Sequence, residues 1–183
     1  MKKFLQFAGI ISLALAAVGF ILMMATHAME YAASNSIANA SGWYSGVAVI
    51  FGKGPYEVSG SILGIGGTGQ GTFEGTLAWN ALLGWIFALA AMIILLLGVV
   101  LPLLKINALQ KFAGLLNLIA VGLLVVGGIF LFFTVPAFGA ANEWDNTNNW
   151  TLGPWWVVAA ILYILAGAVA IAPAAANFLG KKK

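Results

Sequence analysis

Few side chains in this chain are capable of acid–base or metal chemistry, and they lie in two short segments. His27 and Glu30 are three residues apart just after the first apolar stretch, and Glu143 and Asp145 precede the last one. Zinc takes three or four protein ligands, so one histidine and one carboxylate predict neither a metal site nor a cofactor. The pair indicates an interfacial histidine contact, with a pH-sensitive contact as the alternative.

A second pattern, G-x-G-x-x-G at Gly64, Gly66 and Gly69, matches the spacing of a dinucleotide-binding loop. In that loop the glycines open a helix, and an acidic residue follows about 20 residues later. Here they precede a strand-like run and then a long apolar stretch, so we expect no nucleotide. The glycines over 64–71 instead predict a mobile hairpin or bulge loop, because glycine readily adopts positive φ.

The overall composition excludes other classes of chemistry and partner. The chain has no cysteine, which rules out disulfides and thiolate chemistry. Its net charge of +3 comes from lysines at the ends of apolar stretches. No basic patch interleaved with aromatic residues is present, so no nucleic acid is expected. Without cysteine, the long segment 27–78 between the first two apolar stretches, which the lysine pattern predicts to be extracellular, has no disulfide. A long extracellular loop without a disulfide favours a bacterial source.

Four long apolar stretches must position everything else. They cover residues 4–26, 79–104, 112–135 and 155–178 in a 183-residue chain that is 62% hydrophobic and 7% charged. Each exceeds the roughly 20 helical residues that cross a bilayer core of about 30 Å. We therefore predict a membrane all-α four-helix transmembrane bundle, forming a single membrane domain over residues 1–183.

The charged residues predict the orientation of this bundle. Seven of the eight lysines, at positions 2, 3, 105, 111 and 181–183, flank one set of helix ends, and all five acids lie between the other ends. Lysine-rich flanks remain cytoplasmic. This pattern predicts a multi-pass plasma-membrane protein with cytoplasmic N- and C-termini, an inner loop at 105–111, and outer loops at 27–78 and 136–154.

Tryptophans gather at the predicted outer ends of the helices, which is typical of an aromatic belt at a membrane interface. The residues of this expected belt are Trp79, Trp144, Trp150, Trp155 and Trp156.

Small residues recur along the apolar stretches and predict close helix packing, because lipid tails give helices no hydrophobic reason to associate. We expect packing within the bundle, with a dimer or ring interface as the alternative. Buried polar residues predict interhelical hydrogen bonds, with a polar pore lining as the alternative. These residues are Gln6, Ser12, Asn80, Asn117, Tyr163 and Asn177. The expected packing residues are Ala8, Ser12, Ala16, Gly122, Gly127, Gly128, Gly167 and Ala170.

The first outer loop predicts a small extracellular antiparallel β-sheet. Residues 30–41 are expected to extend the first helix by a turn or two, and strand-like runs follow at 47–51, 56–62 and 72–77. Three short strands are marginal alone, so the sheet should rest on the helix ends or on the second outer loop.

Aromatic and acidic residues of both outer loops form a candidate interaction surface. For the second loop, whose acids, amides and aromatics suit carbohydrate or protein recognition, an interfacial position at headgroup level is the favoured reading. The candidate residues are Trp43, Tyr44, Phe51, Tyr56, Trp144, Asp145 and Trp150.

This layout of four spans, a long β-rich first outer loop and a shorter second one resembles the claudin-like tetraspan group. The segment from Ser45-Gly46 to Phe51-Gly52 is also similar to a Ser-Gly-x-x-x-x-Phe-Gly element of small bacterial four-span membrane proteins. These resemblances imply the tetraspan architecture and bring no established activity with them.

We expect a non-enzymatic tetraspan protein with a structural or assembly role exercised through its outer β-rich loop. Its partners would be the lipid bilayer and either copies of itself or another membrane protein. The alternatives are a homo-oligomeric pore or channel subunit and, less favoured, a lipid-modifying enzyme using His27, Glu30, Glu143 and Asp145.

Overall fold

The computed structural model describes the backbone of residues 2–103 and 113–179, and the side chains of residues 7–100 and 114–175. The predicted inner loop at 105–111 and the lysines at 181–183 lie outside the described residues, as do the side chains of Gln6 and Asn177. The chain divides into two compact units. Unit 1 comprises residues 1–20, 84–129 and 160–183, and unit 2 comprises residues 21–83 and 130–159.

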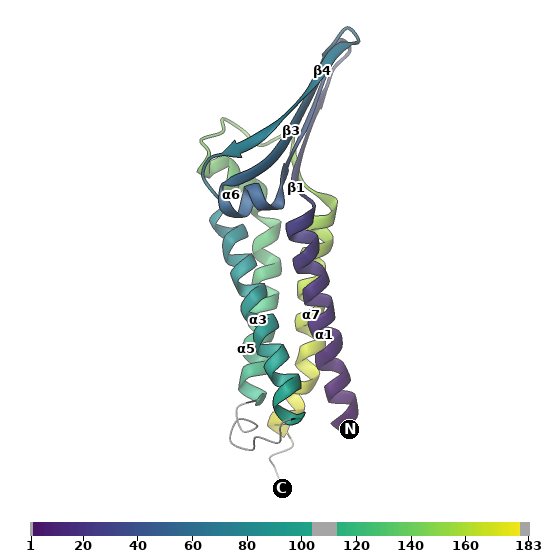
Figure 1. Ribbon diagram of the computed structural model, residues 1–183, viewed down its shortest axis with the longest axis vertical. Coiled ribbons are helices and arrows are strands. Elements are labelled where there is room, and N and C mark those ends of the chain that lie inside the picture. Colours follow the sequence, from purple (N-terminus) through teal and green to yellow (C-terminus); the bar gives the residue numbers. More distant parts are fainter. Residues whose placement is uncertain (1, 104–112, 180–183) are drawn as a thin grey trace. The chain divides into compact units, whose positions relative to one another are not determined.

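Four long helices run through these units: α1 (Lys2–Ala25), α3 (Trp79–Leu103), α5 (Ala113–Phe132) and α7 (Pro154–Leu179) (Figure 1). Each contains a stretch of 19 to 22 residues that is long and apolar enough to cross a membrane. Pro154 begins α7, where its fixed φ suits the helix and its missing N–H costs nothing. The four long apolar helices predicted from the sequence are therefore confirmed.

Unit 1 consists of helical segments that pack closely together where small residues face one another. The Ser12 hydroxyl donates a hydrogen bond of 2.7 Å to the carbonyl of Ala166, and both residues are fully buried. A Cβ at Gly128 would lie 2.7 Å from the carbonyl oxygen of Ala160, so α5 and α7 meet there with backbone in contact. Side-chain size limits how closely the helix axes approach.

The predicted packing residues differ in their surroundings. Ala8, Ser12, Ala16 and Ala170 are buried, and Gly127, Gly128 and Gly167 face neighbouring helices closely. Gly122 has no packing partner among the described residues of the chain: it is exposed, and a Cβ there would meet nothing within 4 Å. The spacing of small residues cannot distinguish the face of α5 that meets a helix from the face that does not.

Interhelical hydrogen bonds from buried polar residues are confirmed at two positions. Ser12 bonds to α7, as described above, and in unit 2 the Asn80 amide donates to the carbonyl of Phe130 over 2.9 Å. Asn117 is buried in unit 1. These bonds tie α1 to α7 and α3 to α5.

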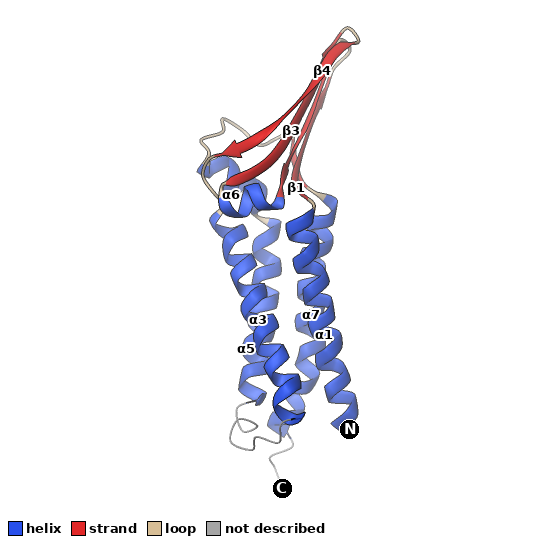
Figure 2. Ribbon diagram, viewed as in Figure 1, coloured by secondary structure: helices blue, strands red, loops and turns tan. Residues whose placement is uncertain are grey.

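Unit 2 carries a five-stranded antiparallel sheet in the order β4-β3-β2-β1-β5 (Figure 2). Four strands come from the predicted first outer loop: β1 (His27–Ser34), β2 (Ala38–Ser45), β3 (Lys53–Ile62) and β4 (Ile65–Glu74). The fifth, β5 (Trp150–Leu152), comes from the second loop and pairs with β1. The sheet is therefore larger than predicted and is shared between both loops.

Three local predictions in this region differ from the structure. Residues 30–34 and 38–41 belong to strands β1 and β2 and do not extend α1, because β1 starts at His27, two residues after the helix ends. The predicted glycine hairpin is present, but its turn is confined to Leu63 and Gly64, and residues 65–71 belong to β4, since a glycine backbone pairs with β3 as well as any other. The predicted strand at 47–51 is helix α2 (Gly46–Phe51).

The end signals of α2 explain the last error. The Ser45 hydroxyl accepts a hydrogen bond from the Ala48 N–H over 3.2 Å, and Gly52 ends the helix at φ 73°. A short run of apolar residues fits a buried strand or a buried helix equally well, so the N-cap serine and the glycine after the run were the informative residues.

The second loop also contains α6 (Thr134–Ala141), and Asn142 ties its end to the segment before α3. The Asn142 side chain donates to the carbonyl of Thr76 and accepts from the N–H of Thr76, each over 2.9 Å. This pair of bonds mimics one rung of a β-ladder and positions α6 beside the sheet.

Candidate interaction surface

The register of the four long strands gives the sheet two chemically different faces. One face carries polar rows that cross the strands: Glu30, Trp43, Glu57 and Gln70 in one row, then Ala32, Ser41, Ser59 and Thr68 in the next. The other face carries Tyr31, Gly42, Val58 and Gly69, then Ala33, Ala40, Gly60 and Gly67. In these rows one face is therefore rich in serine and threonine hydroxyls, and the other consists chiefly of glycine and small aliphatic residues beside Tyr31.

An aromatic cluster fills the second face at the end of the sheet nearest the helices of unit 2. The Tyr44 ring is its centre, with ring centroids 5.0 to 6.0 Å from those of five other residues, each at a distance usual for packed aromatic pairs. Those residues are Tyr56, Phe73, Phe138, Trp144 and Trp150.

Four of the predicted surface residues thus lie in contact with one another. Tyr44, Tyr56, Trp144 and Trp150 are half-buried, and the rings of Trp144 and Trp150 stack at 4.7 Å. Their packing joins both loops into one body. Of the other predicted residues, Trp43 lies on the opposite face, whereas Phe51 and Asp145 are exposed.

Burial, with a smaller effect of the Tyr56 phenol, raises the pKa of Tyr44 above its ordinary 10.0. A raised pKa means that folding favours the neutral phenol, so this stabilisation is present below pH 10 and is lost as pH rises through the folded-state pKa. We expect Tyr44→Phe to melt like the parent protein at neutral pH and to lose less stability than the parent as pH rises above about 10. Thermal melting of both proteins in the same detergent measures this. Equal losses in both proteins would contradict it.

The predicted chemistry-bearing residues are dispersed over the opposite face and the second loop. The His27 ring stacks on Trp43 with centroids 4.0 Å apart, and its Nδ1 lies 3.8 Å from a carboxylate oxygen of Glu30. Among the described residues, no three histidine, aspartate or glutamate side chains are grouped as metal ligands. The His27 side chain therefore makes a small local contact with Trp43 and Glu30 on this face of the sheet.

The far end of the sheet is apolar. Ile62 and Ile65 flank a two-residue turn in which Leu63 has φ 52° and Gly64 has φ 81°, the positive values of a type I′ hairpin. Leu63 is 76% exposed and Ile65 is 83% exposed. The Leu63 N–H donates to the carbonyl of the exposed Ile37 over 2.7 Å, which joins this turn to the β1–β2 turn.

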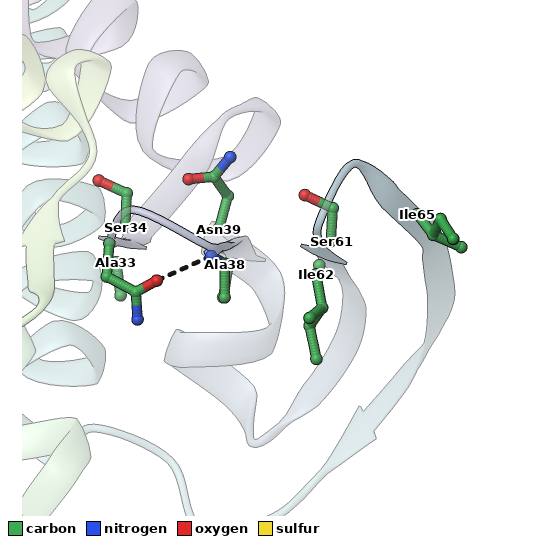
Figure 3. A pocket seen from close by; sticks show the side chains of 10 residues that line it. Ala33, Ser34, Ala38, Asn39, Ser61, Ile62 and Ile65 are labelled. Atoms are coloured by element: carbon green, nitrogen blue, oxygen red, sulfur yellow. Dashed lines mark hydrogen bonds between the residues drawn. The ribbon is translucent and has the colours of Figure 1, made fainter.

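A shallow groove of about 560 Å³ lies beside this tip. Asn35 shapes its edge, because its side-chain oxygen accepts from the N–H groups of Ile37 and Ala38 at 3.0 and 2.7 Å. Figure 3 shows the alternation of the lining strands, with Ser34, Asn39 and Ser61 on one side and Ala33, Ala38 and Ile62 on the other.

The charged residues of the β3–β4 hairpin, Lys53, Glu57 and Glu74, all lie in the half away from the tip. Lys53 and Glu74 face each other across β3 and β4 and form an exposed ion pair of 2.5 Å, which raises the pKa of Lys53 and lowers that of Glu74. Residues 58–73 contain no charged side chain.

Sequence reasoning missed the tip residues and the edge strand β4. The available signal was the aliphatic run around Leu63-Gly64 within an uncharged stretch, which the glycines obscured. No protein-family model matches the chain, and comparison with curated proteins finds no match either. The resemblance to claudin-like and bacterial four-span proteins therefore stays a prediction.

Proposed function

We propose that this chain is a non-enzymatic, multi-pass plasma-membrane protein that makes protein contacts through its sheet, with copies of itself or with another membrane protein. The four long apolar helices support the membrane assignment. They also expose large aliphatic side chains that water would disfavour, among them Ile21, Ile93 and Ile171 at 51–62% exposure. Lysines at one set of helix ends support cytoplasmic termini and an external sheet.

The observation that carries the proposed contact role is the exposed end of the sheet. Ile37, Ile62, Leu63 and Ile65 are 58–83% exposed and lie together at the end of the sheet, in the β1–β2 turn and at the tip of the β3–β4 hairpin. A surface with exposed aliphatic groups and no charge is suited to bind another protein, because little polar desolvation opposes association.

The orientation is testable because the chain has no cysteine. We expect Gly67→Cys, where a Cβ meets nothing within 4 Å, and Asn146→Cys, introduced singly, to react with a membrane-impermeant maleimide added to intact cells. Labelling of either position only after the cells are opened would contradict an external sheet.

The contact role is tested on the full chain in mild detergent by blue-native electrophoresis and light scattering. We expect a particle larger than the monomer, or a retained partner. The combined variant Ile62→Ser, Leu63→Asn, Ile65→Ser should reduce association, whereas Ser59→Ala with Ser61→Ala on the opposite face should not. A monodisperse monomer that retains no partner would contradict the proposal.

A further inference from the structure

We propose that two copies of this chain join by antiparallel pairing of their edge strands β4 into one continuous sheet. This inference rests on the proposed contact function and names its partner as a second copy. It comes from the backbone of β4 (Ile65–Glu74), which lies at one end of the strand order. The described residues place no strand on its outer side.

The register with β3 identifies the backbone groups that face outward. In an antiparallel pair, alternate residues exchange both hydrogen bonds with the partner strand, and the residues between them direct their N–H and C=O away from it. The two-residue turn makes Ile62–Ile65 a bonded pair, so Gly67, Gly69 and Gly71 also bond to β3. The residues whose backbone groups face the free edge are Gly66, Thr68, Gln70 and Thr72.

Nothing in β4 protects this edge from a second strand. Exposed edges are usually blunted by lysine, proline, a bulge or a very short strand. β4 is ten residues long, its register with β3 is unbroken, and its one charged residue is Glu74 at the end. The opposite edge differs, since β5 has three residues and leads directly into Gly153 and Pro154.

The side chains of β4 also suit pairing with a copy of the same strand. A two-fold axis at Gly69 places Gly69 opposite Gly69 and Gly67 opposite Gly71 at non-bonded positions, where the Cα atoms of paired strands approach to about 4.5 Å. Thr68 then faces Gln70, and Gly66 faces Thr72, for about eight backbone hydrogen bonds in total. In this register Glu74 falls opposite the turn glycine Gly64 and so does not meet its own copy.

Antiparallel pairing also determines how the two copies face each other. β4 runs from the apolar tip toward the start of α3, five residues after Glu74. The partner's β4 runs the opposite way, so the helix ends of unit 2 in the two copies lie at opposite ends of the paired strands. This arrangement suits copies held in two facing bilayers.

Disulfide formation between two copies tests the predicted register of their β4 strands directly. In the full chain, which has no cysteine, Gly69→Cys should form a covalent dimer under mild oxidation, because residues at a non-bonded antiparallel pair lie within disulfide reach. The matched control is Gly60→Cys, a glycine one strand further in on β3. We expect at least tenfold more dimer from Gly69→Cys. Equal yields from both variants would overturn the edge pairing.

A backbone variant tests the same contact without cysteine. Gln70→Pro removes an outward N–H while leaving the β3 ladder intact, and an edge strand tolerates proline at such a position. Gln70→Ala is the control, since both variants lose the Gln70–Glu57 side-chain hydrogen bond. We expect Gln70→Pro to melt at the temperature of Gln70→Ala but to dimerise at least tenfold more weakly.

The outcomes separate the pairing from the proposed function. If oligomers persist in Gln70→Pro while Gly69→Cys forms no disulfide, the edge pairing is overturned and the contact function stands. If the parent protein is a monomer without partners, both are overturned. Proteoliposomes of the parent that aggregate with one another, and fail to do so with Gln70→Pro, would support contact between facing bilayers.

Discussion

Replacing Trp156 with alanine is expected to lower the free energy of unfolding by about 3–5 kcal/mol, the usual cost of truncating a buried aromatic residue. Trp156 is completely buried in unit 2, and its indole N–H donates to the carbonyl of Met23 over 3.0 Å. That carbonyl lies in the last turn of α1, where carbonyls lack helical partners. Truncation therefore opens a cavity and also removes the hydrogen bond to the Met23 carbonyl.

The neighbouring Trp155 supplies the control, because it is 54% exposed. We expect Trp155→Ala to change stability by less than about 1 kcal/mol, and Trp156→Phe to lie between the two because it loses chiefly the hydrogen bond. Thermal melting of the full chain in detergent measures all three, with a decrease on the order of 10 °C for Trp156→Ala. Similar decreases for Trp155→Ala and Trp156→Ala would show that burial does not govern this site.

The second large effect is expected at Gly128 in unit 1. A Cβ there would lie 2.7 Å from the Ala160 carbonyl oxygen and 2.9 Å from the Ile164 side chain. Because the nearest atom is backbone, Gly128→Leu must separate α5 from α7. We expect a loss of about 1–3 kcal/mol from overpacking, with more if the Tyr163 region also shifts.

Gly122→Leu on the same helix is the matched control, since a Cβ there meets nothing within 4 Å. It adds the same side chain to an exposed position, so we expect a change within about 0.5 kcal/mol. Melting temperatures in one detergent compare the pair. A larger loss from Gly122→Leu than from Gly128→Leu would mean that Gly122 carries a contact between copies, which is the alternative that its sequence spacing left open.

The pairs Trp155 and Trp156, and Gly122 and Gly128, show that the type and spacing of residues do not reveal which of them are buried. Trp155 and Trp156 were both expected in an aromatic belt, yet one is exposed and the other caps α1 from inside unit 2. Trp144 and Trp150 belong to the same predicted belt, and both pack on Tyr44. Adjacent residues at a helix start point in directions about 100° apart, so only the neighbouring elements decide which one is buried.

The residues of the candidate interaction surface also differ in how far the sequence predicts their role. Tyr44, Tyr56, Trp144 and Trp150 were predicted as contact residues because they are aromatic, and the structure uses them to hold the sheet to α6. The sequence patterns place Ile62 in a strand and Ile65 in the glycine tract, and they give Leu63 no role. Exposure of these aliphatic residues follows from their place at the end of a paired hairpin, which periodicity does not reveal.

Composition and the length of the apolar stretches by themselves determined the four helices, because roughly 20 consecutive apolar residues fit a helix across a hydrocarbon core and little else. Only the tertiary structure decided the partners of the strands, the inclusion of β5, and the use of a glycine tract as an edge strand. The physical reason is that helix bonds form within a segment, whereas strand bonds join residues that are distant in the chain. A glycine strand offers only its backbone, and its role depends on which strands lie beside it.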